Sequence, residues 1–208
     1  MFRSNRKMYA TFLLAMLLTT EASAFSWREL RDGFNTSIEQ FYNTNEPIWT
    51  IFTKADASFN LSCIVDVTLN TTLSNLYFER SYYRNQTRVK SPLRRVLNKR
   101  GTDRSRSTLV YDATRSIYEQ GNPLFNEELL YQSDDGTCGV FKFFKHPNVT
   151  RYDIRVRNCS LAIEPPKNCW TFFKETSQLR VSRHEKLQER KVYDAQCQAI
   201  LWKTDGCQ

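Results

Sequence analysis

The sequence predicts an all-β protein, in which about eight short antiparallel strands stand between two helices. Runs with β-strand character follow one another between residues 48 and 157. Turn signals such as Asp134-Asp135-Gly136 separate them at hairpin-like spacing. Apolar residues of helical period come before and after these runs. Such a series favours an up-and-down barrel or a sandwich, and an eight-stranded barrel has room for one small ligand.

The first helix is predicted over Trp27–Tyr42, where apolar residues recur at every third or fourth position. Ser26 and Glu29 match a capping box at its start. The asparagines and the proline of residues 43–47 end it. Because one face of this helix is apolar, we expect it to pack against the body of the protein.

The predicted strands are short runs that alternate in polarity or are rich in β-branched and aromatic residues. They are Ile48–Thr53, Cys63–Leu69, Leu76–Tyr83, a weaker run at Leu93–Leu97, Ser107–Asp112, Glu127–Ser133, Gly139–Phe144 and Arg151–Arg157.

The pattern changes after Pro165-Pro166. Apolar residues between Cys169 and Thr176 predict a short helix on the barrel wall. Arg180–Lys191 is highly charged and is expected to be a solvated loop or helix. Val192–Trp202 is expected to return to the body, where Cys197 anchors it.

Residues 1–24 have the order of a secretory signal peptide: a basic start, an apolar run and the small residues Ala22-Ser23-Ala24. A membrane anchor is the alternative, but the apolar run Tyr9–Leu18 is shorter than the roughly 20 residues that a span needs. We therefore expect an extracellular protein with no membrane span and a single domain over residues 25–208.

The cysteines also indicate export. An even number of cysteines in an exported chain predicts a disulfide framework, and six allow fifteen pairings. No C-x-x-C occurs and His146 and His184 lie far apart, so neither a metal site nor a cofactor is expected. The cysteines are Cys63, Cys138, Cys159, Cys169, Cys197 and Cys207.

Six N-glycosylation sequons agree with secretion, and a glycan requires an exposed asparagine. The sequon asparagines are Asn35, Asn60, Asn70, Asn85, Asn148 and Asn158.

Four stretches in this order carry a family resemblance. They are Glu46-Pro47-Ile48-Trp49-Thr50, the segment Tyr131–Phe141 with Ser133-Asp134-Asp135 and Cys138-Gly139-Val140, the segment Arg151–Val156, and Cys169 with Phe173, Val192-Tyr193 and Cys197-Gln198. Together they span nearly all of the chain after the signal and resemble the tick salivary lipocalins, the family of the histamine-binding proteins.

The resemblance implies an eight-stranded lipocalin barrel with an N-terminal and a C-terminal helix packed on it. It also implies secretion in saliva and sequestration of a small host mediator, a biogenic amine such as histamine or serotonin, to suppress inflammation or haemostasis. The alternatives are an anionic lipid mediator, such as a leukotriene or fatty acid, and a host protein such as a complement component. The implied disulfides are Cys63–Cys197 and Cys138–Cys169, with Cys159 and Cys207 left for a third.

Capture of an amine requires a carboxylate in a restricted pocket, with aromatic faces around the charge. By resemblance, Asp153 stands where such an acid is found, and Glu46 and Trp49 fall on positions associated with amine binding. The candidate aromatic neighbours are Tyr42, Phe125 and Tyr131.

Each of these residues also has a structural alternative. The polar face that carries Asp153 points either to the lumen or to water. Trp49 either contacts ligand, or plugs the barrel floor or packs under the first helix, and Glu46 either binds or is a solvated turn residue. In histamine binders of the family an acid can follow the cysteine at position 138, where this chain has Gly139. That difference points away from histamine and towards another amine or a lipid mediator.

The stretch Arg84–Arg106 contains nine basic residues and, as its acid, Asp103. It is interpreted either as an anion-binding rim around Arg94 and Arg95 or as solvated strands and loops. No nucleic-acid-binding module surrounds it, so a nucleic-acid partner is not expected. An enzyme is not expected either, because G-x-S-x-G and phosphate-loop motifs are absent from the sequence.

Overall fold

The computed structural model describes residues 36–97, 106–115, 121–145, 148–161, 166–179 and 187–201. All of them belong to one compact unit, Asn35–Gln208. The expected signal peptide and the first part of the predicted N-terminal helix lie outside the described residues, as do Asn35 and Cys207. None of the helices in the described ranges has the length and apolar content that a membrane span requires.

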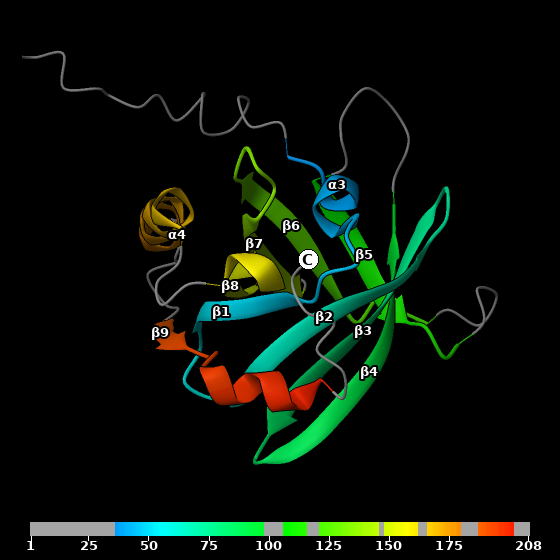
Figure 1. Cartoon of the computed structure of the whole chain (residues 1–208), viewed down its shortest axis with the longest axis horizontal. Helices are drawn as coiled ribbons and strands as arrows, with labels where there is room; N and C mark the ends of the chain where they lie inside the picture. The colour runs from blue at the N-terminus through cyan, green and yellow to red at the C-terminus, as the bar shows by residue number, and fades with distance from the viewer. Residues whose placement is uncertain are drawn as a thin grey trace, which may run out of the picture. The chain divides into compact units, whose positions relative to one another are not determined.

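Eight antiparallel strands form a closed barrel, as predicted (Figure 1). Each strand pairs with its neighbours in the chain, and β1 closes the barrel by pairing with both β8 and β2. The strands are β1 (Ile48–Ala55), β2 (Leu61–Thr71), β3 (Asn75–Arg84), β4 (Thr87–Val96), β5 (Ser107–Asp112), β6 (Phe125–Gln132), β7 (Cys138–Lys145) and β8 (Asn148–Arg157).

The weak run near residue 93 is the second half of a ten-residue strand, β4, which begins six residues earlier. Pro92 concealed the first half, because proline lacks the N–H that a central strand uses. Its carbonyl accepts a hydrogen bond from Ala113 N–H, just beyond the point where β4 and β5 stop pairing at Leu93 and Asp112. An N–H at Pro92 would point to this same side, where β4 and β5 no longer pair, so its absence removes no hydrogen bond of the sheet.

The predicted continuous helix Trp27–Tyr42 is wrong at Ser37, where the backbone is extended. The Ser37 hydroxyl accepts a hydrogen bond from Gln40 N–H, which caps a new helix, α3 (Ile38–Tyr42). As expected, α3 ends before Asn43. Its apolar side chains, Phe41 among them, join the buried cluster at the end of the barrel where β1 begins, so α3 covers that end.

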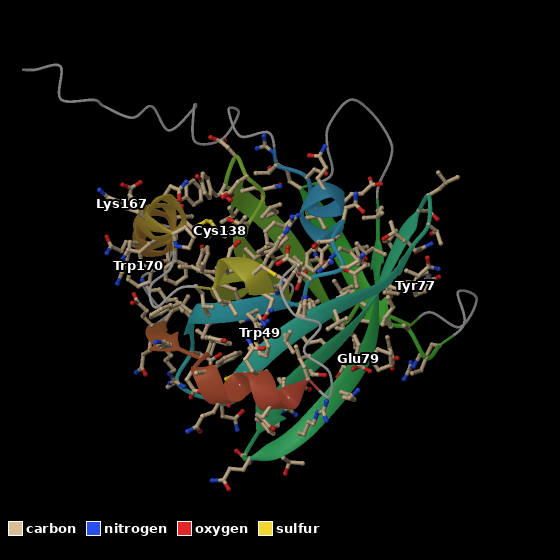
Figure 2. The ribbon with its side chains drawn as sticks, viewed as in Figure 1. Trp49, Tyr77, Glu79, Cys138, Lys167 and Trp170 are labelled. Carbon is tan, nitrogen blue, oxygen red and sulfur yellow. A yellow bond between two sulfur atoms is a disulfide. The ribbon has the colours of Figure 1, made fainter. Side chains whose placement is uncertain are left out.

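The helix predicted after the two prolines is α4 (Lys167–Leu179), and it packs outside strands β6, β7 and β8. The disulfide Cys138–Cys169 joins it to β7, and Figure 2 shows Cys138 beside the helix. On the same side, the ring of Trp170 lies 4.9 Å from that of Phe52 on β1. The barrel wall under α4 is therefore buried on both faces, which is why alternate residues of β8 are apolar.

The charged segment before residue 192 is not only loop or helix, because it contains a ninth strand, β9 (Gln188–Lys191). Beyond Trp49, β2 no longer pairs with β1, and β9 pairs with the edge of β1 that is left open. Val192 also bridges the gap between β1 and β2, since its N–H donates to Ile51 O and its carbonyl accepts from Cys63 N–H. The predicted disulfide Cys63–Cys197 then fixes the following 3₁₀ helix to β2.

Candidate ligand-binding site

Charged side chains that neutralise one another fill the middle of the barrel. Strand alternation turns them inward, and each is at most 5% exposed. They are Asp66 on β2, Arg80 on β3, Arg95 on β4, Glu127 on β6, and Asp153 and Arg155 on β8. We call this set the central network.

Glu127 accepts hydrogen bonds from three guanidinium groups. Nη2 of Arg80 and Nη2 of Arg155 both lie 2.9 Å from its Oε1, and Arg95 binds its Oε2. Burial alone would raise the pKa of Glu127, but Arg155, Arg95 and Arg80 outweigh burial and hold the pKa well below its ordinary value. Glu127 is therefore a fixed anion.

Asp66 is the second fixed anion of the central network. Arg80 binds it with two parallel hydrogen bonds, Nε to Oδ1 at 2.6 Å and Nη2 to Oδ2 at 2.7 Å. Burial opposes its charge, but Arg80 prevails and lowers the pKa of Asp66. The Tyr42 hydroxyl donates to Oδ2 over 2.9 Å, and burial raises the pKa of this phenol. Tyr42, a candidate aromatic neighbour of an amine, is thus hydrogen-bonded to the central network.

Asp153, the candidate ligand acid, points into the barrel, so its polar face is the lumen and not the solvent. Its Oδ1 accepts from the Thr53 hydroxyl at 2.9 Å. Its Oδ2 accepts from Nε of Arg151 at 3.2 Å and from Nη2 of Arg155 at 3.5 Å. Both oxygens are engaged, and two guanidinium groups already neutralise the carboxylate.

Three further candidates lie away from the lumen. Glu46 lies in the loop just before β1, where its carboxylate accepts a hydrogen bond from Cys159 N–H. Trp49 is fully buried, donates to Asn158 Oδ1 over 3.0 Å and meets Tyr193 edge-on, so it packs outside the barrel and not at the barrel floor or under the first helix. A further aromatic candidate, Tyr131, stacks on α4; its ring centre lies 5.0 Å from that of Phe172.

Arg94 and Arg95 do not form the anion-binding rim proposed from the sequence. Arg94 is buried with its guanidinium over the ring of Tyr111, at 5.4 Å. Arg95 is fully buried and lies between the rings of Tyr42 and Phe78, at 4.0 and 4.5 Å from their centres. Adjacent strand residues face opposite sides, so this pair could not share one rim.

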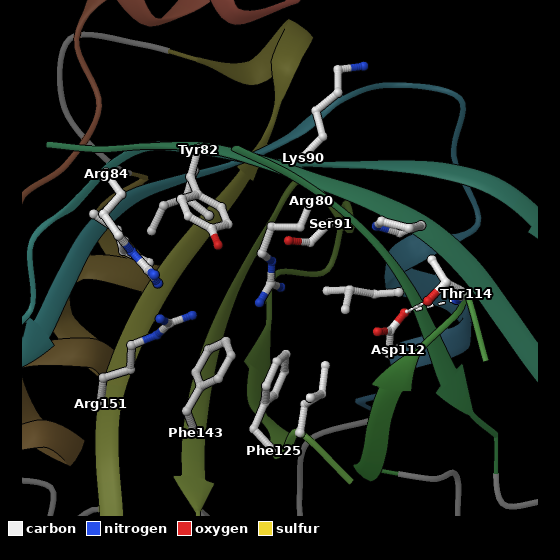
Figure 3. A pocket seen from close by; sticks show the side chains of 15 residues that line it. Arg80, Tyr82, Arg84, Lys90, Ser91, Asp112, Thr114, Phe125, Phe143 and Arg151 are labelled. Atoms are coloured by element: carbon white, nitrogen blue, oxygen red, sulfur yellow. Dashed lines mark hydrogen bonds between the residues drawn. The ribbon is translucent and has the colours of Figure 1, made fainter. Parts of the chain in front are cut away.

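A cavity of about 540 Å³ opens at the end of the barrel opposite α3 (Figure 3). Its aromatic wall contains Phe143 and the candidate Phe125, whose ring centres lie 5.5 Å apart. Arginines form the adjacent wall. In Figure 3, Arg80, Arg84 and Arg151 turn their guanidinium groups towards the same space.

The arginine wall is only partly neutralised. Arg80 uses Nε and Nη2 for the central network, and its guanidinium lies 5.5 Å from the ring centre of Phe125. Arg151 donates from Nε to Asp153 and lies over Phe143, at 3.8 Å from the ring centre. Burial opposes the charge of Arg80, but Asp66 and Glu127 raise its pKa well above the ordinary value, so the charge of this wall that lacks full compensation is that of Arg151.

The opposite wall carries Asp112, the one carboxylate among the described residues that line the cavity. Its Oδ1 accepts from the Thr114 amide and hydroxyl at 2.9 and 2.6 Å, and these bonds lower the pKa of Asp112. Figure 3 shows it well apart from the arginine wall. Lys90, also at the cavity edge, points away in this view and pairs with Glu79 at 2.8 Å.

Sequence reasoning missed the arginine wall, although the strands contained a signal for it. In LYFERSYY the alternation that buries Leu76 and Phe78 places Arg80 on the same face. In RYDIRVR, Arg151 shares its face with Asp153. A cation on an otherwise buried face indicates a polar lumen, because a buried charge requires a partner.

Three of the sequon asparagines, Asn60, Asn70 and Asn85, are exposed. Asn158 is held in the structure instead, since its Oδ1 accepts hydrogen bonds from Trp49 and Gln198. The side chain of Asn148 lies outside the described part of the chain. Glycosylation at the exposed sites stays a prediction, as does the third disulfide, which involves position 207.

No protein-family model and no curated protein matches the sequence. Solved structures do match it. AM182, in its serotonin complex, is 15% identical over 79% of this chain and 95% of that chain, with a TM-score of 0.52. Japanin from Rhipicephalus appendiculatus bound to cholesterol is 10% identical over 74% and 96%, with a TM-score of 0.47. Lobster apocrustacyanin A1 is 6% identical over 74% and 78%, with a TM-score of 0.48.

Likeness at these identities shows the fold alone. The closed eight-stranded barrel followed by α4 is a lipocalin fold. Its cavity has the size and the position at the barrel mouth that suit one small ligand. Two disulfides indicate an extracellular protein, because such bonds persist in oxidising compartments.

Proposed function

We propose that the protein is a secreted carrier that binds one small anionic amphipath in the barrel mouth and so sequesters it. The arginine wall beside Phe125 and Phe143 carries this proposal. A ligand carboxylate would receive charge-assisted hydrogen bonds from Arg80 and Arg151, and its apolar part would lie on the rings and on the aliphatic side chains next to them.

The charge balance of the interior supports an anion. The central network together with Arg151 contains four guanidinium groups and three carboxylates. The guanidiniums belong to Arg80, Arg95, Arg151 and Arg155, and the carboxylates to Asp66, Glu127 and Asp153. In the described part of the chain, Nη1 of Arg80 and both terminal nitrogens of Arg151 take part in no hydrogen bond. One carboxylate would neutralise the excess charge and accept from these nitrogens.

An amine ligand has less support. Each of these three carboxylates already binds a guanidinium, so an ammonium group at Asp153 would have to displace Arg151 or Arg155. Asp112 lies at the outer wall, where solvent weakens its attraction for a cation. The resemblance of the four sequence stretches to tick salivary lipocalins supports a role in saliva. We propose release in saliva and capture of a host lipid mediator, such as a leukotriene or fatty acid, with suppression of inflammation or haemostasis.

Calorimetric titration of the deglycosylated protein tests the proposal. The ligands are oleate, its uncharged methyl ester, histamine and serotonin. We expect oleate to bind at least tenfold more tightly than the ester, and Arg151→Gln to remove most of that difference. A binding heat with histamine or serotonin that disappears in Asp112→Asn would contradict the proposal that the ligand is an anion. Failure of all four ligands to bind would instead favour recognition of a host protein.

A further inference from the structure

The loop of residues 56–60 joins β1 to β2 and places Phe59 beside the arginine wall. The guanidinium of Arg151 lies 5.1 Å from the ring centre of Phe59 and 3.8 Å from that of Phe143. Its one hydrogen bond in the described residues runs from Nε to Asp153. Because a single hydrogen bond at Nε leaves the guanidinium plane free to turn, the two rings set its orientation.

The same loop is held from outside the cavity by Arg190 of β9. Nη2 of Arg190 donates to Ala57 O over 3.1 Å, and Nη1 donates to Phe59 O. Within the loop, Asp56 accepts hydrogen bonds from Ser58 N–H and Phe59 N–H. The loop is therefore a small closed turn, held against the barrel by Arg190 at Ala57 and Phe59 and by Asn60, whose Nδ2 donates to Asn85 Oδ1 over 3.0 Å.

Arg190 stands at this place because of the barrel seam. β9 pairs with the edge of β1 that β2 leaves open, with Arg190 opposite Thr53. Thr53 in turn donates to Asp153, the carboxylate that holds Nε of Arg151. Two of the three supports of Arg151, the ring of Phe59 and the carboxylate of Asp153, thus connect to the strand pair formed by β1 and β9, and the third is the ring of Phe143 on β7.

We propose that Arg190 is a positioning residue of the ligand site. It holds the 56–60 loop so that Phe59 packs against Arg151, and this contact aims the terminal nitrogens of Arg151 at the ligand anion. The inference rests on the proposed function, since it assumes that Arg151 meets an anion. It implies that β9, none of whose residues lines the cavity, sets how strongly the cavity prefers a charged ligand.

A purely structural role for Arg190 makes a different prediction, and the chain offers a matched control. Lys174 on α4 pairs with Glu189 on β9 at 2.6 Å, with both side chains about one-third exposed. Lys174→Gln therefore loosens β9 and leaves the loop bonds of Arg190 in place. Arg190→Gln removes the loop bonds and leaves the pair with α4 intact.

The test compares oleate with methyl oleate by calorimetry in the wild type and four variants. We expect Arg190→Gln to weaken oleate binding about fivefold, the size of a lost cation–π contact, and to change the ester less than twofold. Phe59→Leu should reproduce this result, Phe59→Tyr should keep wild-type binding, and Lys174→Gln should alter neither ligand. Equal weakening of both ligands by Arg190→Gln, or no weakening of oleate, would overturn the positioning role.

The two proposals can fail separately. If the wild type does not prefer oleate to its ester, the anionic ligand fails, and the positioning role fails with it. If the wild type shows the preference and Arg151→Gln abolishes it, but Arg190→Gln keeps it, only the role of Arg190 is wrong.

Discussion

Arg155 and Glu127 form an ion pair in the centre of the barrel, with Nη2 of Arg155 at 2.9 Å from Oε1 of Glu127 and at most 1% of either side chain exposed. Arg80 and Arg95 bind the same carboxylate from the opposite strands. The central network therefore ties β3, β4, β6 and β8 together across the lumen. It also forms a solid polar floor, which confines a ligand to the half of the barrel next to the open end.

Glu127→Gln is expected to lower the free energy of unfolding by about 3–5 kcal/mol, because it leaves three buried guanidinium groups short of a counter-charge. Urea denaturation measures the change. The control is Glu79→Gln, which removes the partner of Lys90, a carboxylate about one-third exposed, and should cost less than about 1 kcal/mol. Equal costs for the two variants would mean that the central network does not form as described.

The pH dependence of stability follows from the same acids. The pKa values of Glu127 and Asp66 are lowered by folding, so the unfolded chain binds more protons than the native one as the pH falls. The contribution of these acids is present in full above the unfolded pKa, about 4, and is lost as the pH drops through the folded values. We expect unfolding free energies in urea to be level from pH 7 to about pH 5 and to fall below that.

The same pH series on Glu127→Gln provides the internal comparison. This variant lacks one of the two buried acids whose pKa folding lowers, so its stability should fall less steeply in acid than that of the wild type. A parallel fall in both proteins would assign the acid sensitivity to other carboxylates.

The third prediction concerns Gly139, which follows Cys138 at the position where histamine binders of the resembled family can have an acid. A Cβ at this position would lie 3.0 Å from both Leu129 Cδ1 and Phe41 Cε2, and 3.1 Å from Phe141 Cε2. The position faces the apolar packing under α3 and not the cavity. Gly139→Ala should therefore cost about 1–3 kcal/mol through overpacking. Gly139→Asp should cost more, because its carboxylate would have no partner there.

The measurement for Gly139 has two parts. Thermal unfolding should rank the wild type above Gly139→Ala and Gly139→Asp, in that order. Calorimetry with histamine at a temperature where Gly139→Asp remains folded should show no new binding. A histamine site created by this one change would contradict the placement of residue 139.

How far the sequence could predict this structure depended on how local each feature is. The strands were readable, because alternation within a strand, as at Leu76, Phe78 and Arg80, is a local property. β9 was not, since its sequence QERK is short and charged, and it becomes a strand only because β2 leaves β1 near Cys63. The break at Ser37 was equally hidden, because a serine inside an apolar period is compatible with a helix or with a cap.

The residues of the candidate site were likewise predictable only where they lie on one strand. The sequence placed Asp153 on a polar face that could be the lumen, and its partner Arg155 stands two residues away on that face. What it did not supply was Glu127, which comes from a strand in another part of the chain and turns the interior acids into partners of arginine. The disulfide pairs Cys63–Cys197 and Cys138–Cys169 came from the family resemblance, and both are present.

The fourth prediction separates two basic residues that border the same cavity. Arg84 belongs to the arginine wall, with its guanidinium 5.6 Å from the ring centre of Tyr82, whereas Lys90 points outward to Glu79 (Figure 3). We expect Arg84→Gln to weaken oleate binding about threefold, as for a partly screened charge near the anion, and Lys90→Gln to leave it unchanged. Calorimetry at two salt concentrations measures both effects, and the loss in Arg84→Gln should shrink at high salt. Because the two variants remove the same formal charge from the same end of the barrel, equal losses would mean that the net charge of the mouth attracts the ligand, and that no arginine wall binds its anionic group directly.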